Sequence, residues 1–249
     1  QLPLLCRLMA EAPSMRMIAG IVLLSLHKPL EVAEYFATMD VMSGGKVVFG
    51  AALGYRDVEY KAFNIEKGTG VVRFEQNLEA IKRLWTEDKV SMKGEYFELD
   101  GASVSMPCVQ EPHPPIWTTG GSDIAHACRT VSNGFTFAMF LTPVDKLAAM
   151  FKGVRKWCRD QGLERPTDDK FAFMPLVAVG ETEKEAREVI ERVFWYVVNN
   201  KAEAQHRAPP GYVETSLFAD FLSGRFTGGR TDAIRTKGME YFRENHVAI

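Results

Sequence analysis

Hydrophobic and polar positions divide the chain into short apolar runs and longer segments in which apolar residues recur at helical spacing. The runs are rich in β-branched and aromatic residues and lack a helical period, as expected for parallel strands covered on both faces. They occupy residues 15–25, 46–53, 116–118, 135–141 and 171–179. Because helical segments lie between them, the pattern predicts an α/β fold, a parallel sheet connected by helical crossovers.

Local signals indicate where the helices begin and end. Pro29 suits a first helical position, and the Gly-Gly pair at 44–45 provides a left-handed stop. After the run at 46–53, Gly54, Gly68 and Gly70 predict a loop. A Thr-Pro pair at 142–143 opens a later helix that Gly162 stops, and a capping box at 182–185 opens another. The faces predicted to be buried are Val32, Ala33, Phe36 and Met39; Phe74, Leu78, Ile81 and Trp85; Leu147, Met150, Phe151, Val154 and Trp157; and Ala186, Val189, Ile190, Val193 and Val197.

Two segments interrupt the alternation of strands and helices. Residues 89–106 have the pattern of a small β-hairpin, and residues 208–230 are an irregular insertion before a last helix over 232–244. Counting a strand that begins at His246, the chain holds about six strand–helix units, whereas a TIM barrel has about eight. We therefore expect one domain over residues 1–249, a (β/α)8 TIM barrel that lacks its first strands, with about two units before Gln1.

A doubly wound sheet is the alternative architecture, because it needs no further residues. Its dinucleotide-binding form would carry a GxGxxG motif after the first strand, and none is present there.

Composition and charge argue against several classes of function. The 30 Lys and Arg residues nearly balance the 32 Asp and Glu residues, which argues against a nucleic-acid or anionic-membrane partner. The longest apolar run, 18–26, is too short to span a bilayer. The cysteines form neither a CxxC pair nor a Cys/His cluster, so we expect reduced thiols in a cytoplasmic protein without a bound metal. They are Cys6, Cys108, Cys128 and Cys158.

The turn Gly120-Gly121-Ser122 is a candidate anion site, because it joins a predicted strand to a predicted helix. Glycines let backbone N–H groups approach a phosphate, the helix N-terminus carries a partial positive charge, and the serine hydroxyl adds a donor. An N-capped helix after a tight turn is the structural alternative. Both interpretations stay open from the residues alone.

Three further positions carry candidate chemistry. Arg73, at the start of a helix, could clamp a phosphate, or it could pair with a neighbouring side chain. His27 follows the first strand and could act as an acid or base, or it could be a packing residue. Gly20-Ile21 in mid-strand could mark a bulge beneath a flat ring, or Gly20 could be an ordinary packing glycine. Gly50 suggests a close backbone approach.

No catalytic triad, metal-ligand cluster or Walker loop is present in the sequence, and no residue is an evident nucleophile. An enzyme of this kind takes its chemistry from a cofactor, which the protein binds and orients.

A series of motifs in fixed order resembles the luciferase-like monooxygenase family. That family reads "hPxxxAE" and then "LDxxSGGRxxxGxGxG", and this chain reads PLEVAE from Pro29 and MDVMSGGKVVFG from Met39. Further matches follow in order: Leu53-Gly54-Tyr55-Arg56, Arg73 with Glu79 and Leu84-Trp85, Gly94 with Tyr96-Phe97, and Pro114-Pro115-Ile116-Trp117 with Gly120-Gly121-Ser122.

The resemblance implies a TIM-barrel oxidoreductase that uses reduced FMN or the deazaflavin F420, often with O₂ and a small organic substrate. It implies phosphate contacts from Arg73, Gly121 and Ser122, and a non-proline cis peptide at Gly20-Ile21. The flavin ring would then lie near Gly20, Ile21 and Ala52. The catalytic acid or base stays unknown, because the histidine that has this role in the family lies on a strand outside this sequence. Within the sequence, His27 is the candidate.

The resemblance also implies a homodimer and a flavin reductase that supplies the reduced FMN. Three alternatives stay open: an F420-dependent dehydrogenase or reductase on the same fold, a non-catalytic flavin-binding subunit, and a sugar-phosphate barrel enzyme.

Overall fold

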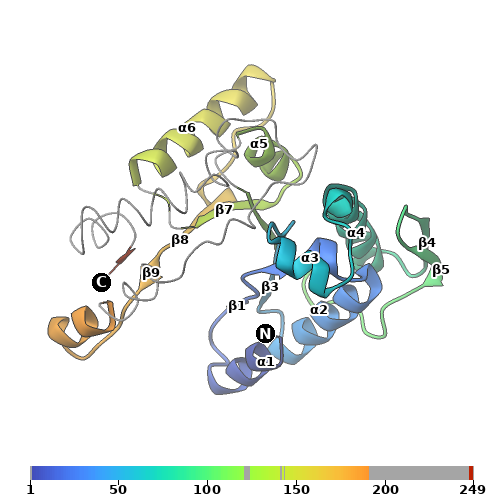
Figure 1. Cartoon of the computed structure of the whole chain (residues 1–249), viewed down its shortest axis with the longest axis horizontal. Coiled ribbons are helices and arrows are strands. Elements are labelled where there is room, and N and C mark those ends of the chain that lie inside the picture. Colours follow the sequence, from blue (N-terminus) through green and yellow to red (C-terminus); the bar gives the residue numbers. More distant parts are fainter. Residues whose placement is uncertain (1, 121–123, 141, 143, 191–246, 249) are drawn as a thin grey trace. The chain divides into compact units, whose positions relative to one another are not determined.

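The computed structural model describes residues 2–120, 124–140, 142, 144–190 and 247–248 (Figure 1). The chain divides into two compact units, Gln1–Thr118 and Thr119–Ile249. We call these the N-terminal unit and the C-terminal unit. The single domain expected over residues 1–249 stays a prediction.

The N-terminal unit is built on parallel strands with helices between them. Strand β3 pairs in parallel with β1, β2 and β6, and β4 pairs with β5 as an antiparallel hairpin. The elements are α1 (Leu2–Glu11), β1 (Met17–Ile18), β2 (Val22–Leu23), η1 (Leu24–Leu26), α2 (Pro29–Ser43), β3 (Val47–Ala52), α3 (Asp57–Ala62), η2 (Lys67–Thr69), α4 (Gly70–Thr86), β4 (Val90–Lys93), β5 (Glu98–Ala102) and β6 (Ile116–Thr119).

The run predicted as one strand over 15–25 is two short strands followed by a 3-10 turn, so this part of the prediction is wrong. Ile18 pairs with Val48 and Val22 pairs with Ala51, which leaves three residues between the pairs on one strand and two on the other. The extra residue is a bulge, as the mid-strand glycine predicts. The Gly20–Ile21 peptide bond in this bulge is cis, as the resemblance implies.

The predicted helix signals of this unit are confirmed. Pro29 is the first residue of α2, and Gly44 ends the helix in the left-handed conformation, with φ at 62°. The predicted face of α2 is buried, and its phenylalanine Phe36 stacks edge-on against Phe49 of β3, with 4.6 Å between the ring centroids. Trp85 of α4 lies against the same rings, 5.4 Å from Phe49.

Two helices of this unit were not predicted. The first is α1, for which no signal was identified, and the second is the six-residue helix α3, in a segment whose glycines predict a loop. Helix α3 owes its place to Tyr60, which is 1% exposed and whose side chain packs inside the unit. The burial of Tyr60 depends on tertiary contacts, so no local sequence pattern predicts it.

The C-terminal unit pairs β7 with β8 and β9 with β10, both in parallel. Its elements are α5 (Ile124–Ser132), β7 (Thr136–Phe140), α6 (Val144–Asp160), η3 (Asp168–Lys170), β8 (Phe171–Met174), β9 (Leu176–Val177) and β10 (Val247–Ala248). Residues 183–190 are also helical. The strand expected to begin near His246 is therefore present as β10.

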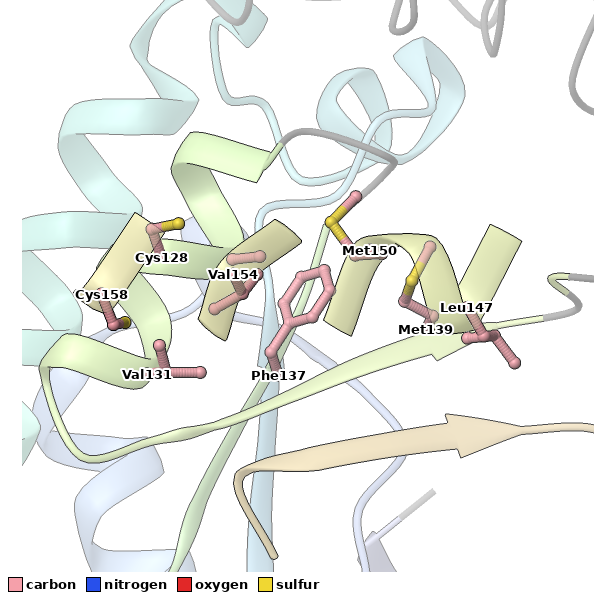
Figure 2. Packing of buried hydrophobic residues seen from close by; sticks show 9 residues of the cluster. Cys128, Val131, Phe137, Met139, Leu147, Met150, Val154 and Cys158 are labelled. Carbon is pink, nitrogen blue, oxygen red and sulfur yellow. The ribbon is translucent and has the colours of Figure 1, made fainter. Parts of the chain in front are cut away.

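A compact apolar core joins α5, β7 and α6 (Figure 2). Phe137 of β7 is fully buried among side chains of both helices, including Val131, Met150 and Val154. The predicted stripe of α6 is confirmed except at its end, where Trp157 is 36% exposed and Cys158 is buried in its place. A helix turns by about 100° per residue, so the small thiol one position later faces the core instead.

The strand predicted over 171–179 is also interrupted. It consists of β8 and β9 with Pro175 between them, because proline has no N–H to continue a strand ladder. The capping box is confirmed: the Glu185 N–H donates to Thr182 Oγ1 at 3.3 Å, and the Thr182 N–H donates to Glu185 Oε2 at 3.3 Å. The predicted insertion at 208–230 and the last helix at 232–244 lie outside the described residues.

All four cysteines are free thiols, as predicted. Cys128 and Cys158 belong to the core of the C-terminal unit, whereas Cys6 and Cys108 are only partly buried. Burial, reinforced by the nearby Asp40 carboxylate, raises the pKa of the Cys108 thiol to about 12. Among the described residues, no helix has the length and hydropathy needed to cross a membrane.

Candidate functional site

Gly50 in the middle of β3 is packed against the bulge of the neighbouring chain segment. A Cβ built on Gly50 would overlap the carbonyl oxygen of Ala19 and lie 3.2 Å from its carbonyl carbon. It would also lie 3.3 Å from Cγ1 of Ile21. Only glycine allows this approach, so β3 and the Gly20-Ile21 bulge lie in direct contact.

The carboxyl end of β3 is held by two buried hydroxyl groups. The carbonyl oxygen of Leu53, which follows Ala52 at the end of β3, accepts hydrogen bonds from Ser25 Oγ and from the Tyr60 hydroxyl, the latter at 3.1 Å. The two hydroxyls lie 2.9 Å apart, and both side chains are almost fully buried. The network therefore fixes the loop after β3 against η1 and α3.

Arg73 lies in the first turn of α4 and is half-buried. Its Nε donates to Thr69 Oγ1 at 2.9 Å, and its guanidinium carbon lies 3.9 Å from the centroid of the Tyr96 ring. Within the described part of the chain, Arg73 forms no ion pair and its two Nη atoms donate no hydrogen bond. Among the described residues, Arg73 therefore does not pair with a neighbouring side chain of α4, which was the structural alternative. Arg73 thus retains hydrogen-bonding capacity for an anion.

Arg73 also lies near the network at the end of β3. Burial raises the pKa of the Tyr60 hydroxyl, its hydrogen bond with Ser25 lowers it, and the positive charge of Arg73 also acts to lower it. A Cβ built on Gly70, the first residue of α4, would overlap the Tyr60 hydroxyl. The start of α4 and the end of β3 therefore meet at Tyr60.

His27 follows η1 and is exposed overall, but one edge of its ring packs on Phe63 at 5.5 Å between centroids. This partial burial lowers the pKa of His27 from 6.5, and the carboxylate of Glu31 opposes the shift. Asn77 of α4 is 3% exposed and donates from Nδ2 to the carbonyl oxygens of Leu24 and His27, at 3.0 and 2.9 Å. The backbone of His27 is thus tied to the helix that carries Arg73.

The candidate turn at 120–122 is described only at its first residue. In the C-terminal unit, a Cβ built on Gly120 would lie 2.9 Å from Nε2 and 3.2 Å from Cγ of His126 on α5. The close contact at Gly120 is therefore with a side chain of its own unit. Gly121 and Ser122 lie outside the described residues, so the phosphate role expected of them stays a prediction.

The Asp40 side chain, part of the motif series, has a structural role. It is fully buried, and its Oδ2 accepts the N–H groups of Val109 and Gln110 at 2.7 and 2.9 Å. Its Oδ1 accepts a hydrogen bond from Gln110 Nε2 at 2.6 Å. Gln110 in turn donates to the Val47 carbonyl at 2.8 Å, so this group joins the end of α2 to β3 and to the segment before β6.

Several residues of this region were not identified from the sequence. Ser25, Tyr60 and Tyr96 carry no local signal of their role, because each acts through a contact distant in sequence. Thr69 lies only four residues before Arg73, and its role was not identified although the contact is local. Asn77 had a signal: it is a polar residue among the apolar positions of the α4 stripe, where a buried amide needs partners. Among the described residues, no group of three His, Cys, Asp or Glu side chains could hold a metal ion.

Comparison with curated proteins identifies relatives of two cofactor types. The FMNH(2)-dependent dimethylsulfone monooxygenase of Pseudomonas putida is 25% identical over 190 residues, which cover 75% of this chain and 51% of that protein. The F420-dependent glucose-6-phosphate dehydrogenase of Amycolatopsis mediterranei is 31% identical over 113 residues, 44% of this chain and 33% of that protein. The chain spans about half or less of the length of these relatives.

Comparison with solved structures supports the fold. The crystal structure of the monooxygenase RslO1 from Streptomyces bottropensis aligns with 99% of this chain and 73% of its own, with a TM-score of 0.67 and 21% identity. The prediction of an α/β fold of the TIM-barrel type, present as part of a barrel, is confirmed. The model of the family described as luciferase-like monooxygenase matches residues 2–222, and the chain therefore belongs to the luciferase-like monooxygenase family.

Proposed function

We propose that this chain is part of a flavin-dependent monooxygenase that uses reduced FMN and O₂ on a small organic substrate. The observation that carries the proposal is Arg73, a half-buried guanidinium that forms no ion pair within the described residues. A partly buried arginine without a carboxylate partner favours an external anion, and the terminal phosphate of FMN has the matching geometry.

The residues near β3 fit the other end of the cofactor. The backbone of Gly20 and Ile21 passes next to β3, and Ala52 contributes only a methyl group at the end of that strand. Small side chains and exposed backbone leave room for a flat ring to approach. In this proposal Gly20, Ile21 and Ala52 support the ring and Arg73 binds the phosphate, while the phosphate contacts expected of Gly121 and Ser122 stay predictions.

Bound reduced FMN would supply the electrons with which O₂ is activated for transfer of one oxygen atom to the substrate. The chain itself would bind and orient the cofactor and exclude water around it. His27 is the candidate proton-transfer group of this proposal, because an imidazole exchanges protons near neutral pH, and partial burial lowers its pKa.

An F420-dependent dehydrogenase or reductase is the second candidate function, because one of the relatives is F420-dependent. Such an enzyme transfers a hydride and needs no O₂. The phosphate of F420 would meet the same arginine, so Arg73 is compatible with both cofactors. Competitive titration of the full-length protein with FMN and F420 separates the two functions.

Charge removal at Arg73 tests the cofactor site. In the full-length protein, Arg73→Gln should weaken FMN binding by about 1.5–3 kcal/mol, the scale of a charge-assisted hydrogen bond, and leave riboflavin, which lacks the phosphate, unchanged. Arg83→Gln is the matched control, because Arg83 lies on the same helix but is already paired with Glu87 at 2.7 and 2.9 Å. Failure of the unaltered protein to bind either FMN or F420 would overturn the proposal.

Product analysis tests the reaction. With NAD(P)H and a flavin reductase, a monooxygenase should place one atom of isotopically labelled O₂ in its product. Turnover that proceeds without O₂ would favour the F420-dependent function, and tight flavin binding without any turnover would favour a non-catalytic subunit. A homodimer, a partner reductase and a cytoplasmic location complete the proposal.

A further inference from the structure

The hairpin β4–β5 contacts the same face of α4 that carries Arg73. Tyr96, in the hairpin turn, places its ring against the Arg73 guanidinium at 3.9 Å. One helical turn further along α4, Gln76 Oε1 accepts the N–H of Glu95 at 2.8 Å. Because residues three apart share a helix face, both contacts hold one turn of the hairpin on one side of α4.

Gly94 completes this docking. A Cβ built there would lie 2.9 Å from Gln76 Oε1 and 2.8 Å from Cε1 of Phe97. The hairpin turn therefore approaches α4 as closely as a backbone without a side chain permits. The position of Tyr96 is set by the fold of the hairpin and by this close approach.

The two anchors of Arg73 leave its outer donors available. A ring stacked on the face of a guanidinium occupies none of the N–H groups, which all lie in the guanidinium plane. Thr69 takes the Nε donor, and its own hydroxyl donates to the Glu66 carbonyl at 2.7 Å, which fixes its orientation. The remaining edge, formed by the two Nη atoms, has the fork geometry that binds two phosphate oxygens.

We propose that Tyr96 is a positioning residue for Arg73, so that the β4–β5 hairpin forms part of the phosphate end of the cofactor site. This inference rests on the proposed function. Stacking on Tyr96 and the bond to Thr69 hold the guanidinium in one orientation before the cofactor arrives. Binding then loses less side-chain entropy than it would with a mobile arginine.

The test compares cofactors with and without a phosphate in the full-length protein. Tyr96→Leu should raise the Kd for FMN by about three- to tenfold, the scale of a cation–π contact, and leave the Kd for riboflavin unchanged within about twofold. Tyr96→Phe retains the stacked ring and should bind FMN as the unaltered protein does. Tyr35→Leu, which removes a tyrosine that is 53% exposed on α2, is the matched control.

A double-mutant cycle separates positioning from a general effect on the pocket. If Tyr96 acts through Arg73, Tyr96→Leu should cause no further loss of FMN affinity in the Arg73→Gln background. Unchanged FMN binding in Tyr96→Leu, or an equal loss of FMN and riboflavin binding, would overturn the inference. Either result is distinct from failure of the proposed function, in which the unaltered protein binds neither FMN nor F420. If the protein prefers F420, the same comparison applies to F420 and its phosphate-free deazaflavin chromophore.

Discussion

A methyl group on Gly50 would overlap the carbonyl oxygen of Ala19. The atom in the way belongs to the backbone, so it cannot move by a change of rotamer. The contact joins the middle of β3 to the bulge that contains Gly20-Ile21, and the proposed ring-binding surface depends on it.

Gly50→Ala should therefore destabilise the protein. We expect the free energy of unfolding to fall by about 1–3 kcal/mol, as for other overpacked interiors, and flavin affinity to fall with it. Denaturant unfolding and flavin titration measure the two effects. Gly68→Ala is the control, since the atom nearest to its added Cβ is Glu66 Oε1 at 3.8 Å. Equal stability of both variants would mean that β3 and the bulge are not in contact.

Ser25 and Tyr60 should contribute to stability as a coupled pair. Each of Ser25→Ala and Tyr60→Phe leaves the Leu53 carbonyl with one hydroxyl donor, so each should cost about 1 kcal/mol. The double variant removes both donors from a buried acceptor and should cost more than the sum of the two. Unfolding in urea completes the cycle, with Tyr35→Phe as an exposed-hydroxyl control. Strict additivity would contradict a shared network.

Replacement of Asp40 should be costly, because its buried carboxylate accepts three hydrogen bonds. Asn at this position must turn its NH₂ group toward the backbone donors of Val109 and Gln110 or toward Gln110 Nε2. Asp40→Asn should lower the free energy of unfolding by about 2–3 kcal/mol, because a buried donor then faces another donor. Glu34→Gln is the comparison: Glu34 accepts two hydrogen bonds from Ser105 at an exposed position, and its loss should cost less. The reverse order of stability would exclude this role for Asp40.

The stability of the protein should decrease on the acid side through His27. Its pKa in the folded protein lies below 6.5, so as the pH falls below 6.5 the unfolded chain binds the proton more readily than the folded protein does. The free energy of unfolding therefore decreases. The contribution is therefore fully present above pH 6.5 and is lost as the pH falls toward the folded pKa. NMR titration of the ring should give a value under 6.5, and a still lower one in Glu31→Gln, which removes the opposing charge. A measured pKa at or above 6.5 would contradict the partial burial of the ring.

Much of the site region was accessible from the sequence because its signals are local. Gly50 and the mid-strand glycine predict a close approach and a bulge, and both features are present. The hairpin at 89–106 is likewise predicted by its alternation and turn residues. The cofactor roles of Arg73, Gly121 and Ser122 came from the resemblance and stay predictions.

The sequence by itself determined the alternation of strands and helices, most of the buried faces and the family, because these depend on spacing and on residues close together in the chain. Tertiary structure decided what the same residues contact. Helix α3 forms where glycines predicted a loop because Tyr60 is buried, and Arg73 stacks on Tyr96 across 23 positions in the chain. Contacts of this kind depend on how distant segments pack, so the periodicity of apolar residues along the chain does not predict them.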